Sequence, residues 1–183
     1  MKKEELNKML DVHKLWLESE GEKGNPAYLE GFDLEGINLS GVNLANANLA
    51  GANLTGAVLA GANLEGAVLA GANMAGADLT GANMTGANMT GTNLTTSNLT
   101  GANLQDANLS GSYLIETNLE DVNLTGADLE YADMEGSKLV GAIFMTELKD
   151  VADLSYCEVT KDQLPWLAIN SGYSDFYSTL NVS

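Results

Sequence analysis

The sequence predicts a solenoid, in which the chain winds into short sides and stacks on itself. A large apolar residue returns at every fifth position from Leu34 to about Val159, with Lys149 as the one break in register. A small residue, mostly alanine, stands two places before it, and glycine often stands two places after it. Because a period of five fits neither the helical nor the strand repeat, the chain must turn regularly to keep these side chains buried.

The first segment, residues 1–24, is expected to form an amphipathic capping helix. Its apolar residues recur at three- and four-residue steps, as on one buried helical face, and are Leu6, Met9, Leu10, His13, Trp16 and Leu17. Gly21 and Gly24 then end the helix, and Asn25-Pro26 starts an extended entry into the repeat. Since the chain's single histidine, His13, lies on the apolar face, we expect a packed capping residue instead of a proton shuttle.

The second segment, residues 25–159, has one large and one tiny inward position in each unit, which indicates a narrow interior. The large positions form a predicted core ladder of Leu44, Leu64, Met84, Leu104, Leu124 and Phe144. Cys157 occupies a small position, so we expect a buried and unreactive thiol. Glycine after the large residue marks a bend or a close backbone approach.

The repeated phrase stands as AGANL, TGADL and TGANM, and its pattern, A(D/N)LXX, resembles the pentapeptide repeat family. The resemblance covers roughly residues 32–159 and recurs more than twenty times in one register. It implies an all-β solenoid, a right-handed quadrilateral β-helix with four pentapeptides in each coil. Residues twenty apart would then stack in columns along the rod.

The third segment, residues 160–183, is interpreted as a C-terminal cap and a dimerisation segment. Thr160 and Gln163 have the spacing of a capping box, which predicts a short helix. The ends of a solenoid expose unpaired backbone and apolar side chains, so both non-repeat segments are expected to cover them. Family members often dimerise through their C-terminal ends, and the resemblance thus predicts a homodimer. Its candidate cap or dimer contacts are Ile143, Met145, Leu148, Trp166, Tyr173, Phe176 and Tyr177. Other apolar residues that the repeat does not require are Tyr113, Ile115, Tyr131 and Val140.

Composition narrows the classes of function. The chain has 25 acidic residues, 8 basic residues and a net charge of −17, and the absence of arginine argues against direct binding of nucleic acid. One cysteine excludes an intramolecular disulfide. No apolar run reaches the roughly 18 residues of a membrane span, and no secretory signal is visible, so a cytoplasmic location is expected.

The acidic residues gather toward the C-terminal end of the repeat. Between Gly36 and Gln105 only Glu65 and Asp78 are charged, whereas residues 106–162 hold most of the carboxylates. Twenty-residue stacking predicts a candidate partner surface of Glu130, Asp133, Asp150 and Asp153. An ordinary solvated acidic face is the simpler interpretation, and a divalent-cation site is an alternative.

The sequence therefore favours a non-enzymatic scaffold or protein-binding module, with no catalytic residue and no cofactor. The resemblance supplies an alternative, because some family members imitate DNA, bind DNA gyrase and confer quinolone resistance or toxin immunity. A third, remote alternative is a flat array of asparagine and threonine that binds ice. The near-neutral centre of the repeat weakens the gyrase hypothesis.

Overall fold

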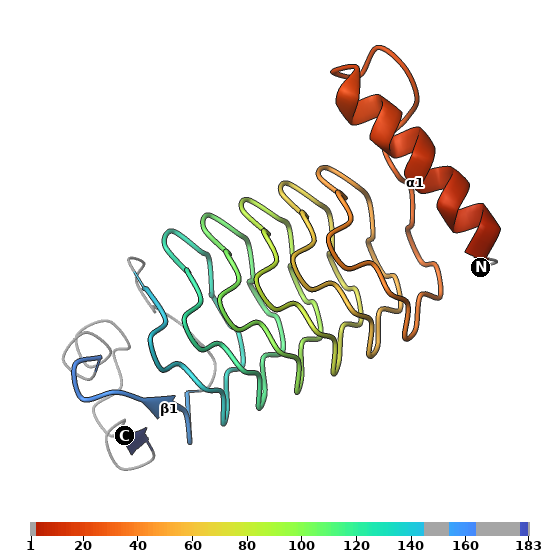
Figure 1. Ribbon diagram of the computed structural model, residues 1–183. Helices are drawn as coiled ribbons and strands as arrows, with labels where there is room; N and C mark the ends of the chain where they lie inside the picture. The colour runs from red at the N-terminus through yellow and green to blue at the C-terminus, as the bar shows by residue number, and fades with distance from the viewer. Residues whose placement is uncertain (1–2, 145–153, 164–179, 183) are drawn as a thin grey trace.

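The computed structural model describes residues 3–144, 154–163 and 180–182 of the chain. Helix α1, Lys3–Glu18, lies at one end of a rod built from successive coils (Figure 1). At the other end, strand β1, Glu158–Val159, pairs in parallel with strand β2, Asn181–Val182. The helix thus ends within the 1–24 segment expected to form the cap.

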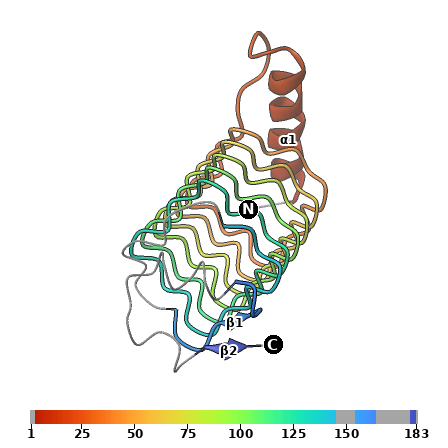
Figure 2. The same cartoon turned by 90° about the vertical axis from the view of Figure 1, so that its left-hand side faces the viewer.

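Each coil contains twenty residues, arranged as four five-residue sides. Parallel bridges join residues twenty apart throughout the rod, as in Asn43 with Asn63. Around that bridge the Leu44 N–H donates to Asn63 O at 2.7 Å, and the Asn63 N–H donates to Val42 O at 3.0 Å. Figure 2 shows the stacked outlines of successive coils. The structure is a quadrilateral β-helix, as predicted.

The sides meet at corners where the backbone is left-handed. In the unit around Leu54, Gly56 has φ 62°, and the Ala57 N–H closes the turn on Leu54 O at 2.9 Å. A left-handed φ costs glycine little because it lacks a Cβ. Among the described corners of the rod, seven carry another residue with φ between 54° and 60°, namely Asn46, Thr96, Asp106, Glu116, Asp121, Tyr131 and Tyr156.

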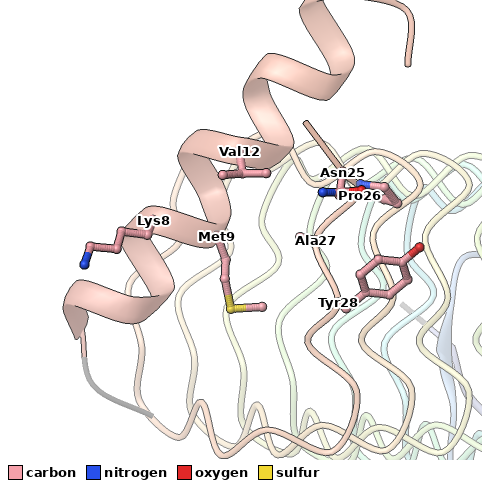
Figure 3. A pocket seen from close by; sticks show the side chains of 7 residues that line it. All are labelled: Lys8, Met9, Val12, Asn25, Pro26, Ala27 and Tyr28. Carbon is pink, nitrogen blue, oxygen red and sulfur yellow. The ribbon is translucent and has the colours of Figure 1, made fainter. Parts of the chain in front are cut away.

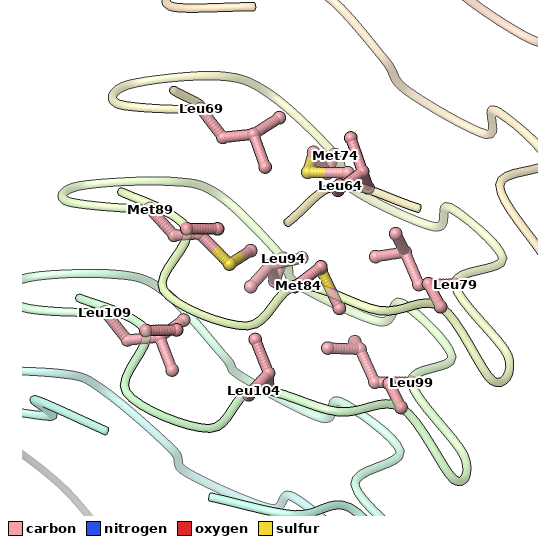
Figure 4. Packing of buried hydrophobic residues seen from close by; sticks show 14 of the residues in the cluster. Leu64, Leu69, Met74, Leu79, Met84, Met89, Leu94, Leu99, Leu104 and Leu109 are labelled. Atoms are coloured by element: carbon pink, nitrogen blue, oxygen red, sulfur yellow. The ribbon is translucent and has the colours of Figure 1, made fainter. Parts of the chain in front are cut away.

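The interior of the rod is filled by the large and small positions of the repeat. Residues of the core ladder lie fully buried through the central coils, and Phe144 near the C-terminal end is 9% exposed. Figure 4 shows leucine and methionine of neighbouring coils packed against one another. The apolar side chains of each coil therefore pack against those of the next coil.

Several small polar residues in the interior form hydrogen bonds to the backbone, whereas the buried Ser112 Oγ has no partner among the described residues. Thr92 Oγ1 donates to Leu69 O at 2.9 Å. The thiol of Cys157 is fully buried, donates to Met134 O at 3.1 Å and lies 3.4 Å from Ser137 Oγ. Cys157 is therefore an interior packing residue.

Helix α1 covers the open N-terminal end of the rod. Leu6 is buried, and Met9 and Leu10 pack against the same core. The first coil has Phe32, Ile37 and Val42 at the positions where residues 47–142 have alanine or another small residue, with Val122 as the exception. These larger side chains occur where the neighbour is a helix and not another coil.

His13 lies fully buried between α1 and the start of the rod. Its Nδ1 accepts a hydrogen bond from the Ala27 N–H at 3.1 Å, and its ring stacks on Trp16 with centroids 5.8 Å apart. Nε2 has no hydrogen-bond partner in the described structure. Burial lowers the pKa of His13 below its ordinary value of 6.5. The side chain is a neutral hydrogen-bond acceptor that fixes the helix to the first coil.

At the C-terminal end, Gln163 bonds to the last described coil. Its Oε1 accepts from the Thr160 N–H at 2.8 Å, which is the glutamine half of the predicted capping box. Its Nε2 donates to Leu139 O at 2.7 Å and to Ala142 O at 3.2 Å. Residues 161–163 form a turn, and the predicted short helix would continue into residues 164–179, outside the described residues.

Candidate interaction surface

Asparagine side chains run in columns along the outside of the rod. Nδ2 of Asn63 donates to Asn43 Oδ1 at 3.1 Å, and Asn83 repeats this bond to Asn63. Asn103 donates instead to Thr85 Oγ1 at 2.9 Å. The Asn83 Oδ1 also accepts from the Thr85 N–H, two residues on. These bonds tie neighbouring coils together, so the asparagine columns are part of the framework of the rod.

The middle of the rod has almost no charge. Between residues 36 and 105 the charged side chains are Glu65 and Asp78. Asp78 Oδ1 accepts from both the N–H and the Oγ1 of Thr80, the same arrangement that asparagine forms elsewhere in the repeat. The Asp78 carboxylate therefore accepts the local hydrogen bonds that an asparagine side chain accepts elsewhere in the repeat.

Carboxylates become frequent beyond residue 105. In the described part of this region they are Asp106, Glu116, Glu120, Asp121, Asp128, Glu130, Asp133, Glu135, Glu158 and Asp162. The lysines there are Lys138 and Lys161, and neither lies within 4.0 Å of a described carboxylate oxygen. The C-terminal half of the described rod thus has a strongly negative surface.

The four residues of the predicted partner surface are only partly described. Glu130 and Asp133 lie on adjacent sides of the rod, separated by the corner at Tyr131. Glu130 is exposed, whereas Asp133 is half-buried and its Oδ1 accepts from the Glu135 N–H at 3.2 Å. Asp150 and Asp153 lie outside the described residues.

The structure likewise describes only part of the predicted set of cap or dimer contacts. Ile143 is described and 52% exposed at the C-terminal end of the rod. The other predicted contacts lie outside the described residues and are Met145, Leu148, Trp166, Tyr173, Phe176 and Tyr177.

The sequence prediction named Tyr113 and Tyr131 among the apolar residues that the repeat does not require, and the structure places them with residues that the prediction did not group with them. One side of the C-terminal coils, residues 111–116, 131–136 and 154–156, is named here the aromatic–acidic face. Its three tyrosines are all exposed, Tyr113 by 52%, Tyr131 by 64% and Tyr156 by 58%. Its three carboxylates are Glu116, Asp133 and Glu135.

Several residues of this face could be noticed in the sequence, because they differ from the residue that is usual at their position in the repeat. Tyr113 occupies an asparagine position, and its backbone bridges to Asp133 in the next coil. Tyr131, Tyr156 and Glu116 occupy corner positions, where glycine is usual. These departures from the repeat mark the three tyrosines and Glu116, but not Asp133, which stands at a position where the repeat itself allows aspartate.

Two hollows lie near the ends of the described rod. One of about 280 Å³ lies between α1 and the start of the first coil, with Met9, Val12, Pro26 and Tyr28 around it and Lys8 at its edge (Figure 3). Another of about 290 Å³ is lined by Ala142, Ile143, Phe144, Asp162 and Gln163. Neither brings together a nucleophile with a base.

Two other kinds of site, a metal centre and a membrane span, are absent from the described residues. No group of three or more histidine, cysteine, aspartate or glutamate side chains is placed there to hold a metal ion. No described helix is long and apolar enough to cross a bilayer. The negative surface of the C-terminal half of the rod, and the aromatic–acidic face within it, are therefore the main candidates for function.

Solved structures similar to this chain are themselves repeat proteins. HetL, a pentapeptide repeat protein involved in heterocyst differentiation regulation in Nostoc sp. strain PCC 7120, is 28% identical over 86% of this chain and 68% of its own, with a TM-score of 0.37. A pentapeptide repeat protein of the Arabidopsis thaliana thylakoid lumen is 28% identical over 78% of each chain, with a TM-score of 0.44.

The fluoroquinolone resistance protein QnrB1 is a more distant match. It is 18% identical over 80% of this chain and 97% of its own, with a TM-score of 0.38. A search of curated proteins finds no significant match.

A family profile identifies the repeat directly. The profile described as "Pentapeptide repeats (8 copies)" matches residues 27–61, 62–101 and 102–141, which together make up more than half of the chain. The match agrees with the twenty-residue coil, the buried leucine ladder and the left-handed corners. This chain is a member of the pentapeptide repeat family, and its fold is the right-handed quadrilateral β-helix.

Proposed function

We propose that this protein is a non-enzymatic scaffold that binds a protein partner through the C-terminal half of its rod. The observation that carries the proposal is the separation of charge along the axis. Two charged residues occupy the stretch from 36 to 105, whereas ten described carboxylates follow it. A partner with a basic surface would be steered to one end of the rod.

The framework suits such a role because it holds surface residues in fixed register. Backbone bonds of 2.6–3.0 Å between coils accompany the asparagine columns through the centre of the rod. The small interior positions leave little room for side-chain rearrangement. Groups on the surface are therefore preorganised, which limits the entropy lost on binding.

Inhibition or protection of DNA gyrase is the second candidate, and the net charge of −17 favours it. The distribution of that charge favours a different kind of partner. Residues 36–105 make about three and a half coils, or roughly 17 Å of rod at the usual spacing between strands. Duplex DNA of that length carries about ten phosphates, whereas this stretch carries two carboxylates.

The proposal is tested by capture of partners on the immobilised full chain. The double variant Glu130→Gln, Asp133→Asn removes two charges from the C-terminal half. The matched control, Glu65→Gln with Asp78→Asn, removes two charges from the middle. We expect partners identified by mass spectrometry to be lost with the first pair, retained with the second, and released as salt is raised.

Two outcomes would contradict the proposal. Equal loss of partners with both double variants would show that position along the rod does not matter. Inhibition of supercoiling by purified gyrase, at micromolar concentrations and with equal dependence on both charge pairs, would favour the gyrase hypothesis.

A further inference from the structure

Tyr113 occupies a position that is structural elsewhere in its column. In the preceding coil Asn93 donates from Nδ2 to Asn73 Oδ1 at 3.1 Å, and its Oδ1 accepts from the Thr95 N–H at 3.0 Å. A tyrosine ring has no polar atom near its Cβ that could make either bond. The framework therefore gives no reason for tyrosine at this position, and its ring is exposed on the outside of the rod.

Tyr131, Tyr156 and Glu116 stand at left-handed corners, with φ of 58°, 60° and 54°. Glycine adopts this conformation without steric strain, whereas residues with a Cβ disfavour it. Every corner from residue 51 to residue 91 is glycine. At three corners bordering one face, the chain thus carries a side chain at a cost in backbone strain.

The rings and carboxylates of this face are interleaved in neighbouring coils. The Leu114 N–H, directly after Tyr113, donates to Asp133 O at 2.6 Å. The Glu116 N–H donates to Glu135 O at 2.8 Å. Coils are about 4.8 Å apart, so these bonds place aromatic and acidic side chains within reach of one bound segment. The aromatic–acidic face contains no lysine.

Building on the proposed function, we propose that the aromatic–acidic face binds an arginine-bearing segment of the protein partner. A guanidinium group is planar, so it can stack on a tyrosine ring while donating two hydrogen bonds to a carboxylate. The lysine ammonium group has the same charge, but it is not planar and cannot stack on a ring in this way. Tyrosine also supplies contact area with few rotatable bonds, which makes it common at the centres of interfaces.

The test uses the full chain and three fluorescent peptides of equal length. One alternates arginine with glycine, one lysine with glycine, and one glutamate with glycine. Binding is measured by fluorescence anisotropy at about 0.15 M salt, where diffuse surface attraction is screened. We expect the arginine peptide to bind about fivefold more tightly than the lysine peptide, and the glutamate peptide not to bind.

Variants can install the residue that the repeat normally uses, so that folding is preserved. Tyr113→Asn restores the asparagine column, and Tyr131→Gly and Tyr156→Gly restore unstrained corners. Each should weaken the arginine peptide about threefold to fivefold and reduce its preference over the lysine peptide. Thermal melting should show the Tyr113→Asn and Tyr156→Gly variants at least as stable as the parent.

The chain offers matched controls for both kinds of group. Tyr28→Asn makes the same change at the same repeat position in the first coil, where Tyr28 is 60% exposed. Asp133→Asn removes a carboxylate of the face and should weaken binding of the arginine peptide, whereas its control, Asp128→Asn, removes the same charge from a neighbouring side of the same coil. Neither control should change the preference for arginine.

Equal binding of the arginine and lysine peptides would overturn this inference. So would an equal loss of affinity in the Tyr28→Asn and Tyr113→Asn variants. Either result would still allow partner capture to depend on Glu130 and Asp133, so failure of this inference is distinguishable from failure of the proposed scaffold function.

Discussion

At the scale of single residues, the corners show where the chain carries strain. Thr96 is left-handed with φ 57°, although its β-branched side chain disfavours this conformation. Its Oγ1 donates to the carbonyl of the adjacent Thr95 at 2.7 Å, a local bond that does not join coils. Glycine would adopt the same backbone with less strain.

Thr96→Gly is therefore expected to stabilise the protein by about 1 kcal/mol. The matched control is Thr95→Gly at the preceding residue, whose φ is not left-handed. That change should destabilise by about 0.5–1 kcal/mol, because glycine loses more backbone entropy on folding. Chemical denaturation followed by circular dichroism measures both, and a loss of stability in Thr96→Gly would contradict the strain assigned to the corner.

His13 predicts how stability depends on pH. Burial lowers the pKa of His13 in the folded state below 6.5, so the unfolded chain binds the proton more readily. The stability that neutral His13 contributes is present above pH 6.5 and is lost as pH falls from there toward the lowered pKa. We expect the melting temperature of the wild type to fall over this interval.

The His13→Gln variant isolates this effect. Glutamine offers a neutral acceptor for the Ala27 N–H, and the variant keeps every carboxylate of the chain. The difference between the wild-type and variant melting curves should therefore shrink as pH falls below 6.5. A difference that does not depend on pH would contradict the assignment.

At the scale of structural elements, the interior of each coil followed from the sequence because one five-residue rule sets every buried position. Corners were also predicted from glycine. The aromatic–acidic face was not, because grouping its residues requires knowing which units share a side of the coil. Asp133 also stands where the repeat allows aspartate, so its position alone does not mark it. The helix ends at Glu18, earlier than the glycines alone indicate, because Glu20 is already left-handed.

A central core residue tests the coil as an element. Leu104 is fully buried, and its column neighbour in the preceding coil is Met84. Leu104→Asp should destabilise the rod by several kcal/mol, because it buries a charge with no partner. Leu104→Met, which copies the neighbouring residue, should cost less than about 1.5 kcal/mol. Equal melting temperatures for the two variants would contradict an inward side chain at this position.

At the scale of the whole molecule, the two ends of the rod differ. Helix α1 covers the N-terminal end, whereas exposed Ile143 and many carboxylates lie toward the other. A second copy of the chain could cover Ile143, as predicted from the sequence. Because most of the predicted contacts lie outside the described residues, the dimer remains a prediction.

Light scattering coupled to size exclusion tests the dimer, which should have twice the 19.2 kDa mass of the chain. Ile143→Asp should shift it to the monomer by placing a charge in an apolar contact. The matched control is Val68→Asp, the same kind of change at an exposed asparagine position in the middle of the rod. A monomeric wild type at micromolar concentration would refute the prediction.

Because each coil contains twenty residues, the number of coils also fixes the distance between helix α1 and the aromatic–acidic face. Removing twenty residues from the centre would move the face about 4.8 Å closer to the helix without changing its direction. Removing five would turn the face by a quarter turn while shortening the rod little. The number of whole coils therefore sets the distance between the helix and the face, whereas the addition or removal of single five-residue units mainly sets the direction in which the face points.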